Sequence, residues 1–503
     1  MLTQAWEPLA TELACASCDN EVSRLLSRLL EQSEGGAPPT NAKDLAVFIG
    51  CDTRPSAGEL VAAAKAGVEA MGLHVLDLGE VSTPQLHFQV ASINSHKLKW
   101  SPPTHGLAAS AVLAQPASTP PSSSLTDPLS LDLYFDSMLS GFEQLLPAAS
   151  SSSSSSAADT LYVDCANGVG AKQLAKAAER LSKSGIKLVL INDGAPGHCG
   201  LNNKCGADYV QKEKVAPAGF ESVPAGSRCC SIDGDADRLV YFTLDEPAST
   251  SGQRRVGLLD GDKVAALTAL LVRDLIAGLP AEEAAHVKVG VVQTAYANGA
   301  STTYLTQDLG LEVACTKTGV KHLHEVAHSY DVGVYFEANG HGTALFSKPL
   351  LSRLAQLEDS NPAAKQLLAL SRVINQSVGD ALSCILAVEL ALRRKGWDCA
   401  AWQGLYTDLP SRQTKLGVKD RAAITTTDAE RKCVKPAGLQ DAVDAAVKEA
   451  GPQARAFVRP SGTEDCVRVY AEAAGTQAAA DALALKVMQA VWDLAGGTGP
   501  RPE

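Results

Sequence analysis

Residues 233–238 read DGDADR and place three carboxylates at alternate positions of one short segment. The apolar runs on either side are typical of strands, so the six residues are expected to form a loop between two strands. Three carboxylates that converge on one point repel one another unless a cation neutralises them. We therefore predict a divalent metal site, with Mg²⁺ held by Asp233, Asp235 and Asp237.

The EF-hand is one alternative, because its calcium loop also begins D-x-D-x-D. It requires Gly at the sixth position and Glu at the twelfth, where this chain has Arg238 and Leu244. The EF-hand is therefore excluded. A solvated acidic turn without a metal remains open, although the apolar flanks and Arg238 argue against it.

A second cluster begins at Arg459, where the sequence reads RPSGTEDCVR. Arg459 and Arg468 offer guanidinium groups, Ser461 and Thr463 offer hydroxyls, and Gly462 lets backbone N–H groups approach a ligand closely. A phosphate needs this mixture because it presents several acceptor oxygens and a negative charge. We predict a phosphate-binding loop here, and an ordinary surface hairpin with a Ser-Gly turn is the alternative.

A third segment, YFEANGHGT, ends an expected strand at Glu337 and continues into a glycine-flanked loop at Asn339. A carboxylate beside an amide can accept from and donate to neighbouring sugar hydroxyls, which binding of phosphate alone would not require. Asn-Gly is also a common turn, and we expect His341 to be structural. We interpret the segment as the hydroxyl-binding part of a phosphosugar site.

The turn TKTGVK gives a weaker indication of anion binding, because it carries Lys317 and Lys321 and opens a helix. Helix N-termini with nearby ammonium groups suit anions. Solvated lysines would give the same pattern, so both interpretations stay open.

The elements around these loops alternate between strands and helices. A strand at 46–50, a helix at 56–71 and a strand at 74–78 form a βαβ unit, which implies a parallel sheet with helices packed on it. A single helix is expected at 131–146, between two Ser/Pro-rich stretches. Two further units repeat the alternation. Their expected elements are strands at 161–165, 187–191, 288–293, 311–315 and 331–337, and helices at 171–183, 263–275 (capped by Asp262) and 301–309. Two more helices, at 361–375 and 380–395, are expected after the third unit.

The last part of the chain has a different pattern, with a helix at 428–450, strands at 455–459 and 466–473, and a helix at 477–494. We therefore predict an α/β protein whose metal, phosphate and hydroxyl-binding loops, on separate units, meet in a cleft between domains. The expected domains are an incomplete α/β domain at 1–158, an α/β domain with the metal loop at 159–262, an α/β sugar-binding domain at 263–400, and an α+β phosphate-binding domain at 401–503.

The composition of the chain limits the kinds of partner that it can bind. The formal charge of −12 and the pI near 5.4 argue against nucleic acid or an anionic membrane surface as the main partner. No apolar run is long enough to span a bilayer, and the N-terminus lacks the pattern of a signal peptide. The spacing of the cysteines does not match a disulfide framework, and Cys15 and Cys18 form a lone C-x-x-C. The serine run at 150–156 is interpreted as a linker. We expect a monomer in the reducing cytosol.

Seven stretches together carry a family resemblance. They are SIDGDADRLVYF, VVQTAYANGAS, CTKTGVKHLH, GVYFEANGHGTALF, LYTDLPSRQ, TTTDAER and AFVRPSGTEDCVRVYAEA. In this order they resemble the phosphoacetylglucosamine mutases of the α-D-phosphohexomutase superfamily, from Met1 to about Pro502 apart from the Ser/Pro-rich insertions. The resemblance implies three α/β sheet domains and a C-terminal α+β domain around a central cleft.

The resemblance also implies an activity, the conversion of N-acetylglucosamine 6-phosphate to the 1-phosphate on the route to UDP-N-acetylglucosamine. In this family a phosphoserine bound to Mg²⁺ donates its phosphate to the sugar, and the bisphosphate intermediate reorients and returns the other phosphate. Carried over to this chain, Asp233, Asp235 and Asp237 are the metal ligands, and Arg238 stabilises the transferring phosphoryl group. The implied substrate contacts are Glu337, Ala338 and Asn339 for the sugar, and Arg459, Pro460, Ser461, Gly462, Thr463 and Arg468 for the phosphate that does not react.

The chain departs from the family pattern in two places. The family phosphoserine lies in a T-A-S-H-N-P loop, and this string is absent from the 503 residues; Cys51 stands where the family tends to carry Arg. We therefore expect a chain that is truncated at its N-terminus and that binds Mg²⁺ and phosphosugar without turnover. Two alternatives stay open: an inactive phosphosugar-binding relative, and a metal-dependent sugar phosphatase, which would leave the two substrate loops unexplained.

Overall fold

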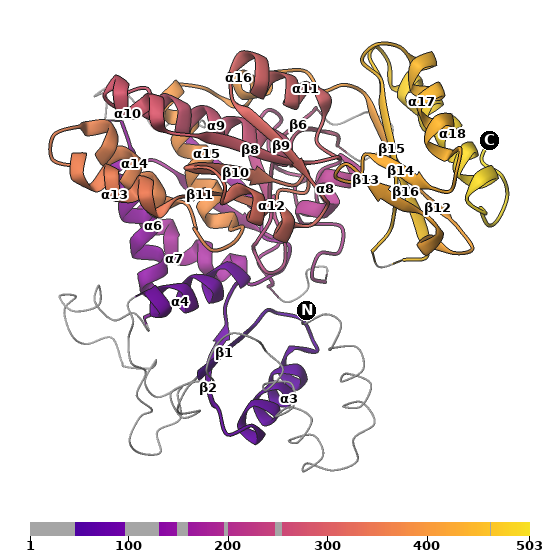
Figure 1. The fold of residues 1–503 in the computed structure, drawn as a ribbon. Coiled ribbons are helices and arrows are strands. Elements are labelled where there is room, and N and C mark those ends of the chain that lie inside the picture. The colour runs from indigo at the N-terminus through magenta and orange to yellow at the C-terminus, as the bar shows by residue number, and fades with distance from the viewer. Residues whose placement is uncertain (1–45, 96–129, 148–158, 196–199, 247–253, 463) are drawn as a thin grey trace. The chain divides into compact units, whose positions relative to one another are not determined.

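The computed structural model describes residues 46–95, 130–147, 159–195, 200–246, 254–462 and 464–503 (Figure 1). The chain divides into two compact units, which are described separately. The first holds the described residues up to Val81, those from Gln89 to Ser95, and Ser130, and the second holds Ser82–Phe88 and the described residues from Leu131 onward. Helix α4 (Thr83–Ser95) contains residues of both units.

The first unit contains two parallel strands joined by a helix. These elements are β1 (Ala46–Cys51), α3 (Ala57–Ala70) and β2 (His74–Glu80). Ala46 pairs with His74, and the parallel register continues to Ile49 and Asp77. The βαβ unit predicted from the sequence is therefore confirmed.

A five-stranded sheet in the second unit carries the acidic loop, the name used below for residues 233–238. Its strand order is β4-β3-β5-β6-β7. The strands are β3 (Thr160–Asp164), β4 (Lys187–Ile191), β5 (Arg228–Ile232), β6 (Leu239–Leu244) and β7 (Val256–Leu259), and α7 (Gly170–Lys183) connects β3 to β4. The first three strands run parallel, whereas β5 and β6 form an antiparallel hairpin with the acidic loop at its tip.

A four-stranded sheet carries the second predicted loop. Its order is β11-β10-β8-β9, with β8 (Val289–Thr294), β9 (Glu312–Thr316) and β10 (Val332–Phe336) parallel and β11 (Gly342–Phe346) antiparallel to β10. The sequence did not predict β11. Because β10 and β11 form a hairpin, the segment Glu337–His341, called the EANGH loop below, is the turn between them.

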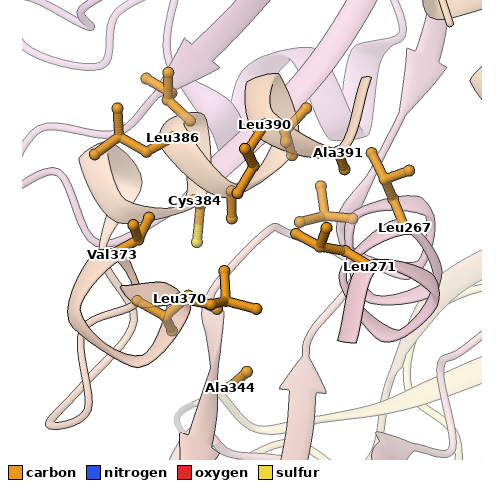
Figure 2. Packing of buried hydrophobic residues seen from close by; sticks show 14 of the residues in the cluster. Leu267, Leu271, Ala344, Leu370, Val373, Cys384, Leu386, Leu390 and Ala391 are labelled. Atoms are coloured by element: carbon orange, nitrogen blue, oxygen red, sulfur yellow. The ribbon is translucent and has the colours of Figure 1, made fainter. Parts of the chain in front are cut away.

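Three helices pack together over this sheet and form much of the main core. They are α9 (Gly261–Ile276), α14 (Pro362–Val373) and α15 (Ala381–Lys395). Figure 2 shows their apolar side chains meeting with Ala344 of β11; the labelled ones are Leu267, Leu271, Leu370, Val373, Cys384, Leu386, Leu390 and Ala391. Each fully buried leucine here stabilises the fold by about 1.5–3 kcal/mol relative to an exposed one.

The C-terminal part is an antiparallel sheet with two helices packed side by side on it (Figure 1). The sheet order is β12-β16-β15, and β15 (Arg455–Pro460) pairs with β16 (Cys466–Glu472). The other elements are β12 (Ser411–Gly417), β13 (Thr425–Thr427), β14 (Lys432–Lys435), α17 (Leu439–Ala450) and α18 (Gln477–Leu494). Residues 459–465, which are the end of β15 and the loop that follows it, are called the RPSGTED loop below; the other predicted phosphate contact, Arg468, lies on β16.

The predicted helix at 428–450 was wrong in its first half. Asp428, Ala429 and Glu430 have positive φ angles of 52°, 54° and 68°, and they form the turn between β13 and β14. Consecutive left-handed residues cannot belong to a right-handed helix, so the helix begins only at Leu439. The sequence offered no glycine as a sign of this turn.

Two other helix predictions needed correction. Asp260, not Asp262, is the N-cap of α9, because its side chain accepts from the N–H groups of Asp262 and Lys263. The predicted helix at 301–309 is a short α-helix, α11 (Gly299–Thr303), followed by a π-helical turn, Tyr304–Asp308.

The remaining helices of the described residues are α6 (Asp132–Leu145), α8 (Ala207–Glu213), α10 (Ala281–His286), α12 (Val320–Ala327), α13 (Lys348–Leu357), α16 (Cys399–Gln403) and a 3-10 turn at Arg421–Ala423. Among the described helices, none combines the length and apolar character that a membrane crossing requires. The C-x-x-C at Cys15 and Cys18 and the serine run at 150–156 lie outside the described residues. The four domain boundaries drawn from the sequence stay a prediction.

Candidate active site

The three carboxylates of the acidic loop converge. One carboxylate oxygen from each of Asp233, Asp235 and Asp237 lies within 4.8 Å of the others. Asp233 and Asp237 are buried, and Asp235 is half-buried. The loop is therefore a set of hard oxygen donors gathered in a small volume, which is the arrangement that a divalent cation needs.

Backbone hydrogen bonds fix the shape of the acidic loop. Asp233 Oδ1 accepts from the N–H groups of Asp237, at 3.0 Å, and Arg238, at 3.1 Å. Ala236 has a φ of 60°, and its carbonyl accepts from the N–H of Ala381 at 3.0 Å. These contacts hold a backbone shape that an alanine would not adopt by preference.

A close backbone approach also supports the loop. The N–H of Val169 donates to the carbonyl of Gly234 at 3.0 Å. A Cβ atom on Gly168 would lie 2.3 Å from the carbonyl oxygen of Gly234, so position 168 has no room for a side chain. No motif in the sequence marks Gly168 as a support of the acidic loop.

The electrostatics of the acidic loop favour a bound cation. Burial, together with Asp237 and Asp235, raises the pKa of Asp233 well above its usual range. Burial and Asp235 likewise raise the pKa of Asp237 to about 6, against the opposing effect of Arg238. Since a cation relieves both the repulsion and the loss of hydration, the residues present fit a divalent metal.

A hydroxyl outside the loop orients one of the three carboxylates. Thr83 Oγ1 donates to Asp235 Oδ2 at 2.7 Å, and the N–H of Thr83 donates to the carbonyl of Asp235 at 3.2 Å. Groups behind a metal ligand fix its direction. Thr83 lies far from the acidic loop in the sequence, and no motif pointed to it.

Arg238 is placed between carboxylates of two elements. Its Nη1 donates to Asp208 of α8 at 2.9 Å, and its Nε lies 3.7 Å from both Asp233 and Asp237. The side chain keeps 33% of its surface exposed. A guanidinium held beside the acidic loop in this way can face an anion, but its role at a transferring phosphoryl group stays a prediction.

The EANGH loop lies directly against the acidic loop. The N–H of Leu239 donates to the carbonyl of Gly340 at 3.2 Å, and His341 Nδ1 lies 3.5 Å from Asp237 Oδ2. Burial, assisted by Arg238, lowers the pKa of His341 to about 4, so its ring is neutral at pH 7. His341 was expected to be structural, and the structure places it in contact with a candidate metal ligand.

The predicted sugar-contact residues are held by different partners. Glu337 Oε1 accepts from the N–H of Gly319 at 3.1 Å, and the carbonyl of Ala338 accepts from the N–H of Gly261 at 3.2 Å. Asn339 Oδ1 accepts from the N–H of His341 at 3.1 Å. Each of these residues therefore has a fixed position at the tip of the β10–β11 hairpin.

Two arginines face each other across the strands that flank the RPSGTED loop. Arg459 of β15 pairs directly with Arg468 of β16 in the antiparallel register. Ser461 is 4% exposed, and its hydroxyl accepts from the N–H of Glu464 at 3.3 Å. Gly462 has nothing within 4 Å of where a Cβ would lie, and Pro460 ends β15. Thr463 lies outside the described residues.

Two further residues support this loop, and no motif predicts a role for either of them. Arg421 Nη1 donates to the carbonyls of Ser461, at 3.1 Å, and Glu464, at 2.8 Å. Glu430 Oε1 lies 3.2 Å from Nε of Arg459. Glu430 belongs to the TTTDAER stretch, which resembles the family but contains no pattern that predicts a chemical role. Lys317 and Lys321 are exposed, so the anion-binding interpretation of their turn stays a prediction.

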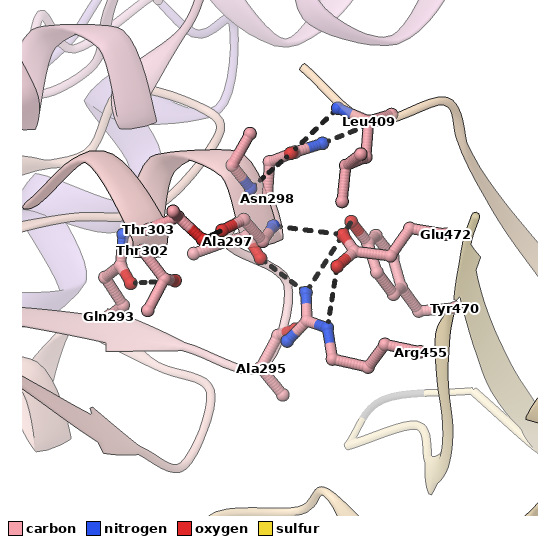
Figure 3. Close-up of polar contacts among 12 residues, drawn as sticks. Gln293, Ala295, Ala297, Asn298, Thr302, Thr303, Leu409, Arg455, Tyr470 and Glu472 are labelled. Atoms are coloured by element: carbon pink, nitrogen blue, oxygen red, sulfur yellow. Dashed lines mark hydrogen bonds and ion pairs between the residues drawn. The ribbon is translucent and has the colours of Figure 1, made fainter. Parts of the chain in front are cut away.

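The strand that carries Arg459 is anchored at its other end (Figure 3). Arg455 forms a bidentate ion pair with Glu472, at 3.0 and 3.1 Å, and its terminal nitrogens donate to the carbonyls of Ala295 and Ala297. Glu472 also accepts from the N–H of Gly299 at 3.2 Å. These contacts fasten the C-terminal sheet to the segment that follows β8.

Comparison with known families agrees with this architecture along the chain. Models described as phosphoacetylglucosamine mutase AMG1, domain II and domain III, match residues 126–240 and 260–397. The phosphoglucomutase/phosphomannomutase alpha/beta/alpha domain I matches residues 24–98, and the C-terminal domain of the same group matches residues 416–490.

Individual relatives match over nearly the whole chain. The chain is 43% identical over 473 residues to a phosphoacetylglucosamine mutase of Arabidopsis thaliana, covering 91% of this chain and 78% of the relative. It is 42% identical over 508 residues to the phosphoacetylglucosamine mutase of Homo sapiens, covering all of this chain and 84% of the relative.

Solved structures give the same result. N-acetylphosphoglucosamine mutase of Aspergillus fumigatus, in complex with GlcNAc-6P and magnesium, matches with a TM-score of 0.80 and 37% identity, covering 97% of this chain and 88% of that one. A substrate complex of an N-acetylglucosamine-phosphate mutase matches with a TM-score of 0.80 and 33% identity, covering 97% and 84%. The chain therefore belongs to the phosphoacetylglucosamine mutase family of the α-D-phosphohexomutase superfamily.

Proposed function

We propose that this chain recognises N-acetylglucosamine 6-phosphate, the substrate that phosphoacetylglucosamine mutases interconvert with N-acetylglucosamine 1-phosphate for the synthesis of UDP-N-acetylglucosamine. As a member of its family the chain is a phosphohexomutase, an isomerase that moves a phosphoryl group. The observation that carries the proposal is the direct joining of the acidic loop to the EANGH loop, through Leu239 and Gly340 at 3.2 Å. A candidate metal site and a candidate hydroxyl-binding loop are thereby held side by side.

Asp233, Asp235 and Asp237 would hold the Mg²⁺ ion. When bound there, Mg²⁺ supplies positive charge that offsets the negative charge of a phosphoryl group. The related Aspergillus fumigatus structure contains magnesium together with GlcNAc-6P, which supports the choice of ion. Thr83 orients Asp235, and Arg238 offers the transferring phosphoryl group a guanidinium that Asp208 holds in place.

The substrate would be held at its two ends by different loops. Glu337 and Asn339 provide a carboxylate and an amide for sugar hydroxyls, with Ala338 between them. Arg459 and Arg468, with Pro460, Ser461, Gly462 and Thr463 between them, would bind the phosphate that does not react. A bound phosphate would also relieve the repulsion between two arginines in direct register.

The reaction of this family also needs an acceptor oxygen that takes the phosphoryl group in turn. The resemblance assigns this role to a phosphoserine in a T-A-S-H-N-P loop, a string that the 503 residues do not contain. Binding and turnover therefore need separate tests. We expect the 503-residue polypeptide to bind the phosphosugar and not to isomerise it.

The two other candidate functions are supported less well. A sugar phosphatase would need the acidic loop but not the EANGH and RPSGTED loops. A phosphosugar-binding protein from outside the mutase family is not favoured either, because the matches to phosphoacetylglucosamine mutases cover 78% and 84% of those relatives. We further propose a monomer in the cytosol; the described cysteines are free thiols, as a reducing compartment requires.

The test combines a binding measurement with a turnover assay. Calorimetric titration with N-acetylglucosamine 6-phosphate in the presence of Mg²⁺ should show saturable binding, and ³¹P NMR should show no accumulation of the 1-phosphate. Failure to bind would refute the proposed substrate. Isomerisation at the rate of a serine-containing relative would instead refute the assignment of the phosphoserine.

A further inference from the structure

One carboxylate joins the RPSGTED loop to the turn that supports the EANGH loop. Glu430 Oε2 accepts from both the N–H of Thr318, at 2.9 Å, and the hydroxyl of Thr318, at 2.6 Å. Its other oxygen, Oε1, lies 3.2 Å from Nε of Arg459. The side chains of Arg459 and Glu430 are 13% and 15% exposed, so water screens their ion pair only partly.

The next residue after Thr318 makes the connection to the predicted sugar contacts. The N–H of Gly319 donates to Glu337 Oε1 at 3.1 Å. Two successive backbone N–H groups of one turn are therefore bound by carboxylates from two different loops. The continuous path runs from Arg459 through Glu430, Thr318 and Gly319 to Glu337.

The backbone around Glu430 supports a role beyond local folding. Asp428, Ala429 and Glu430 have φ angles of 52°, 54° and 68°, a region that residues with a side chain rarely occupy in succession. Arg431 Nη2 donates to Asp428 Oδ1 at 2.6 Å and closes the turn. This unfavourable turn delivers the Glu430 carboxylate to Thr318 and Arg459.

We infer that Glu430 is a positioning residue that orients Arg459 for the substrate phosphate and sets its place relative to the Glu337 carboxylate. The inference rests on the proposed function, since it takes Arg459 as a phosphate contact. Glu430 does not touch the substrate in this role. It acts through Arg459 on one side and through Thr318 and Gly319 on the other.

Glu430 could either orient Arg459 or occupy the place of the phosphate as a competing carboxylate, and the geometry favours the first role. The ion pair is formed at Nε, on the inner edge of the guanidinium, so the terminal amino groups are not consumed by it. The guanidinium also lies 5.9 Å from the centre of the Tyr296 ring. The contact at Nε is an ion pair without a hydrogen bond, and together with the Tyr296 ring it directs the outer edge of the guanidinium away from Glu430.

The decisive variant is Glu430→Gln, which keeps an oxygen for the N–H of Thr318 but removes the charge that faces Arg459. We expect the affinity for N-acetylglucosamine 6-phosphate to fall about tenfold, as for loss of a charge-assisted contact, while affinity for free N-acetylglucosamine stays unchanged. In an Arg459→Ala background the same substitution should have almost no effect, because a positioning residue acts only through its partner. Glu430→Asp should restore part of the loss, since it restores the charge.

A matched control is Asp481→Asn, which removes a carboxylate that binds Arg412 of the same sheet at 2.7 Å on the surface. It should leave the binding of N-acetylglucosamine 6-phosphate unchanged. A second readout needs no ligand: hydrogen exchange of the segment that contains Thr318 and Gly319 should be faster in Glu430→Ala than in the parent, with α18 unaffected.

Three outcomes would overturn the inference. Tighter binding in Glu430→Gln would show that the carboxylate competes with the phosphate, unchanged binding would show that Glu430 does not orient Arg459, and fully additive losses with Arg459→Ala would show independent roles. If the parent binds inorganic phosphate but not N-acetylglucosamine 6-phosphate, the proposed function fails, and the same three comparisons with inorganic phosphate then decide the role of Glu430. If the parent binds neither, both proposals fail.

Discussion

Arg459 and Arg468 occupy directly opposite positions on β15 and β16, so two guanidinium groups emerge from the same register of an antiparallel pair. Like charges in this relation destabilise a sheet unless other groups offset them. Glu430 faces Arg459 at 3.2 Å, and Glu464 faces Arg468 at 3.0 Å. Each arginine therefore has one carboxylate partner, which offsets the like charge across the strand pair.

Arg459→Ala should weaken phosphosugar binding. Loss of a charge-assisted contact costs about 1.5–3 kcal/mol, which corresponds to about one to two orders of magnitude in affinity. Calorimetric titration with N-acetylglucosamine 6-phosphate measures the change in affinity. Arg412→Ala, in the same sheet but paired with Asp481 on the surface, is the control and should bind like the parent. Parent-like binding by Arg459→Ala would remove this residue from the site.

Asp235→Asn should weaken Mg²⁺ binding at least about tenfold, or about 1.4 kcal/mol, because it removes one charge from the three-carboxylate cluster. Asp245 follows β6 at the opposite end of the same hairpin and is exposed, so Asp245→Asn is the control. Titration of Mg²⁺ by calorimetry compares the two variants. Equal affinities would exclude the acidic loop as the metal site.

Gly168→Ala should disturb the acidic loop without touching a carboxylate. Its Cβ would lie 2.3 Å from the carbonyl oxygen of Gly234, and a backbone atom cannot move aside as a flexible side chain would. We expect a loss of stability of about 1–3 kcal/mol, typical of overpacking, together with weaker Mg²⁺ binding. Urea unfolding and Mg²⁺ titration measure the two effects.

The control for this substitution is Gly200→Ala, since nothing lies within 4 Å of the added Cβ at position 200. It should change stability by no more than about 0.5 kcal/mol. If Gly168→Ala also proved neutral in both measurements, the close approach of residues 168 and 234 would not be needed to shape the loop.

Asp260 gives a prediction for pH dependence. Burial and the nearby Asp408 raise its pKa to about 7, from an unfolded value near 3.9. Between these values the folded state binds more protons than the unfolded state, so this carboxyl makes stability fall as pH rises from about 4 to about 7. Asp260→Asn keeps a helix cap and removes the titration, so its stability should fall less with pH, by up to about 1.4 kcal/mol per pH unit.

Urea unfolding at several pH values compares Asp260→Asn with the parent. Asp398→Asn, which also replaces a helix N-cap but at an exposed position, is the control and should keep the slope of the parent. A parental slope in Asp260→Asn would mean that Asp260 does not titrate in this range.

The loops that carry the candidate site residues could be predicted from the sequence better than the contacts that support those loops. The metal site at DGDADR could be predicted from its alternate carboxylates and apolar flanks alone, because residue spacing within one loop decides whether its side chains can converge. Thr83 and Glu430 could not be found in the same way, since each reaches its partner across more than a hundred residues of chain. The helix predicted at 428–450 failed because tertiary contacts stabilise a left-handed turn that residue propensities disfavour.

We propose that this chain recognises an N-acetylated sugar phosphate through loops that bind its two ends. Calorimetric titration of the 503-residue protein in Mg²⁺, with N-acetylglucosamine 6-phosphate and with free N-acetylglucosamine, tests it most directly. We expect the phosphorylated sugar to bind at least about tenfold more tightly, since only it engages the charge-assisted contacts of Arg459 and Arg468. Equal affinities for the two sugars, or no binding of either, would contradict the claim.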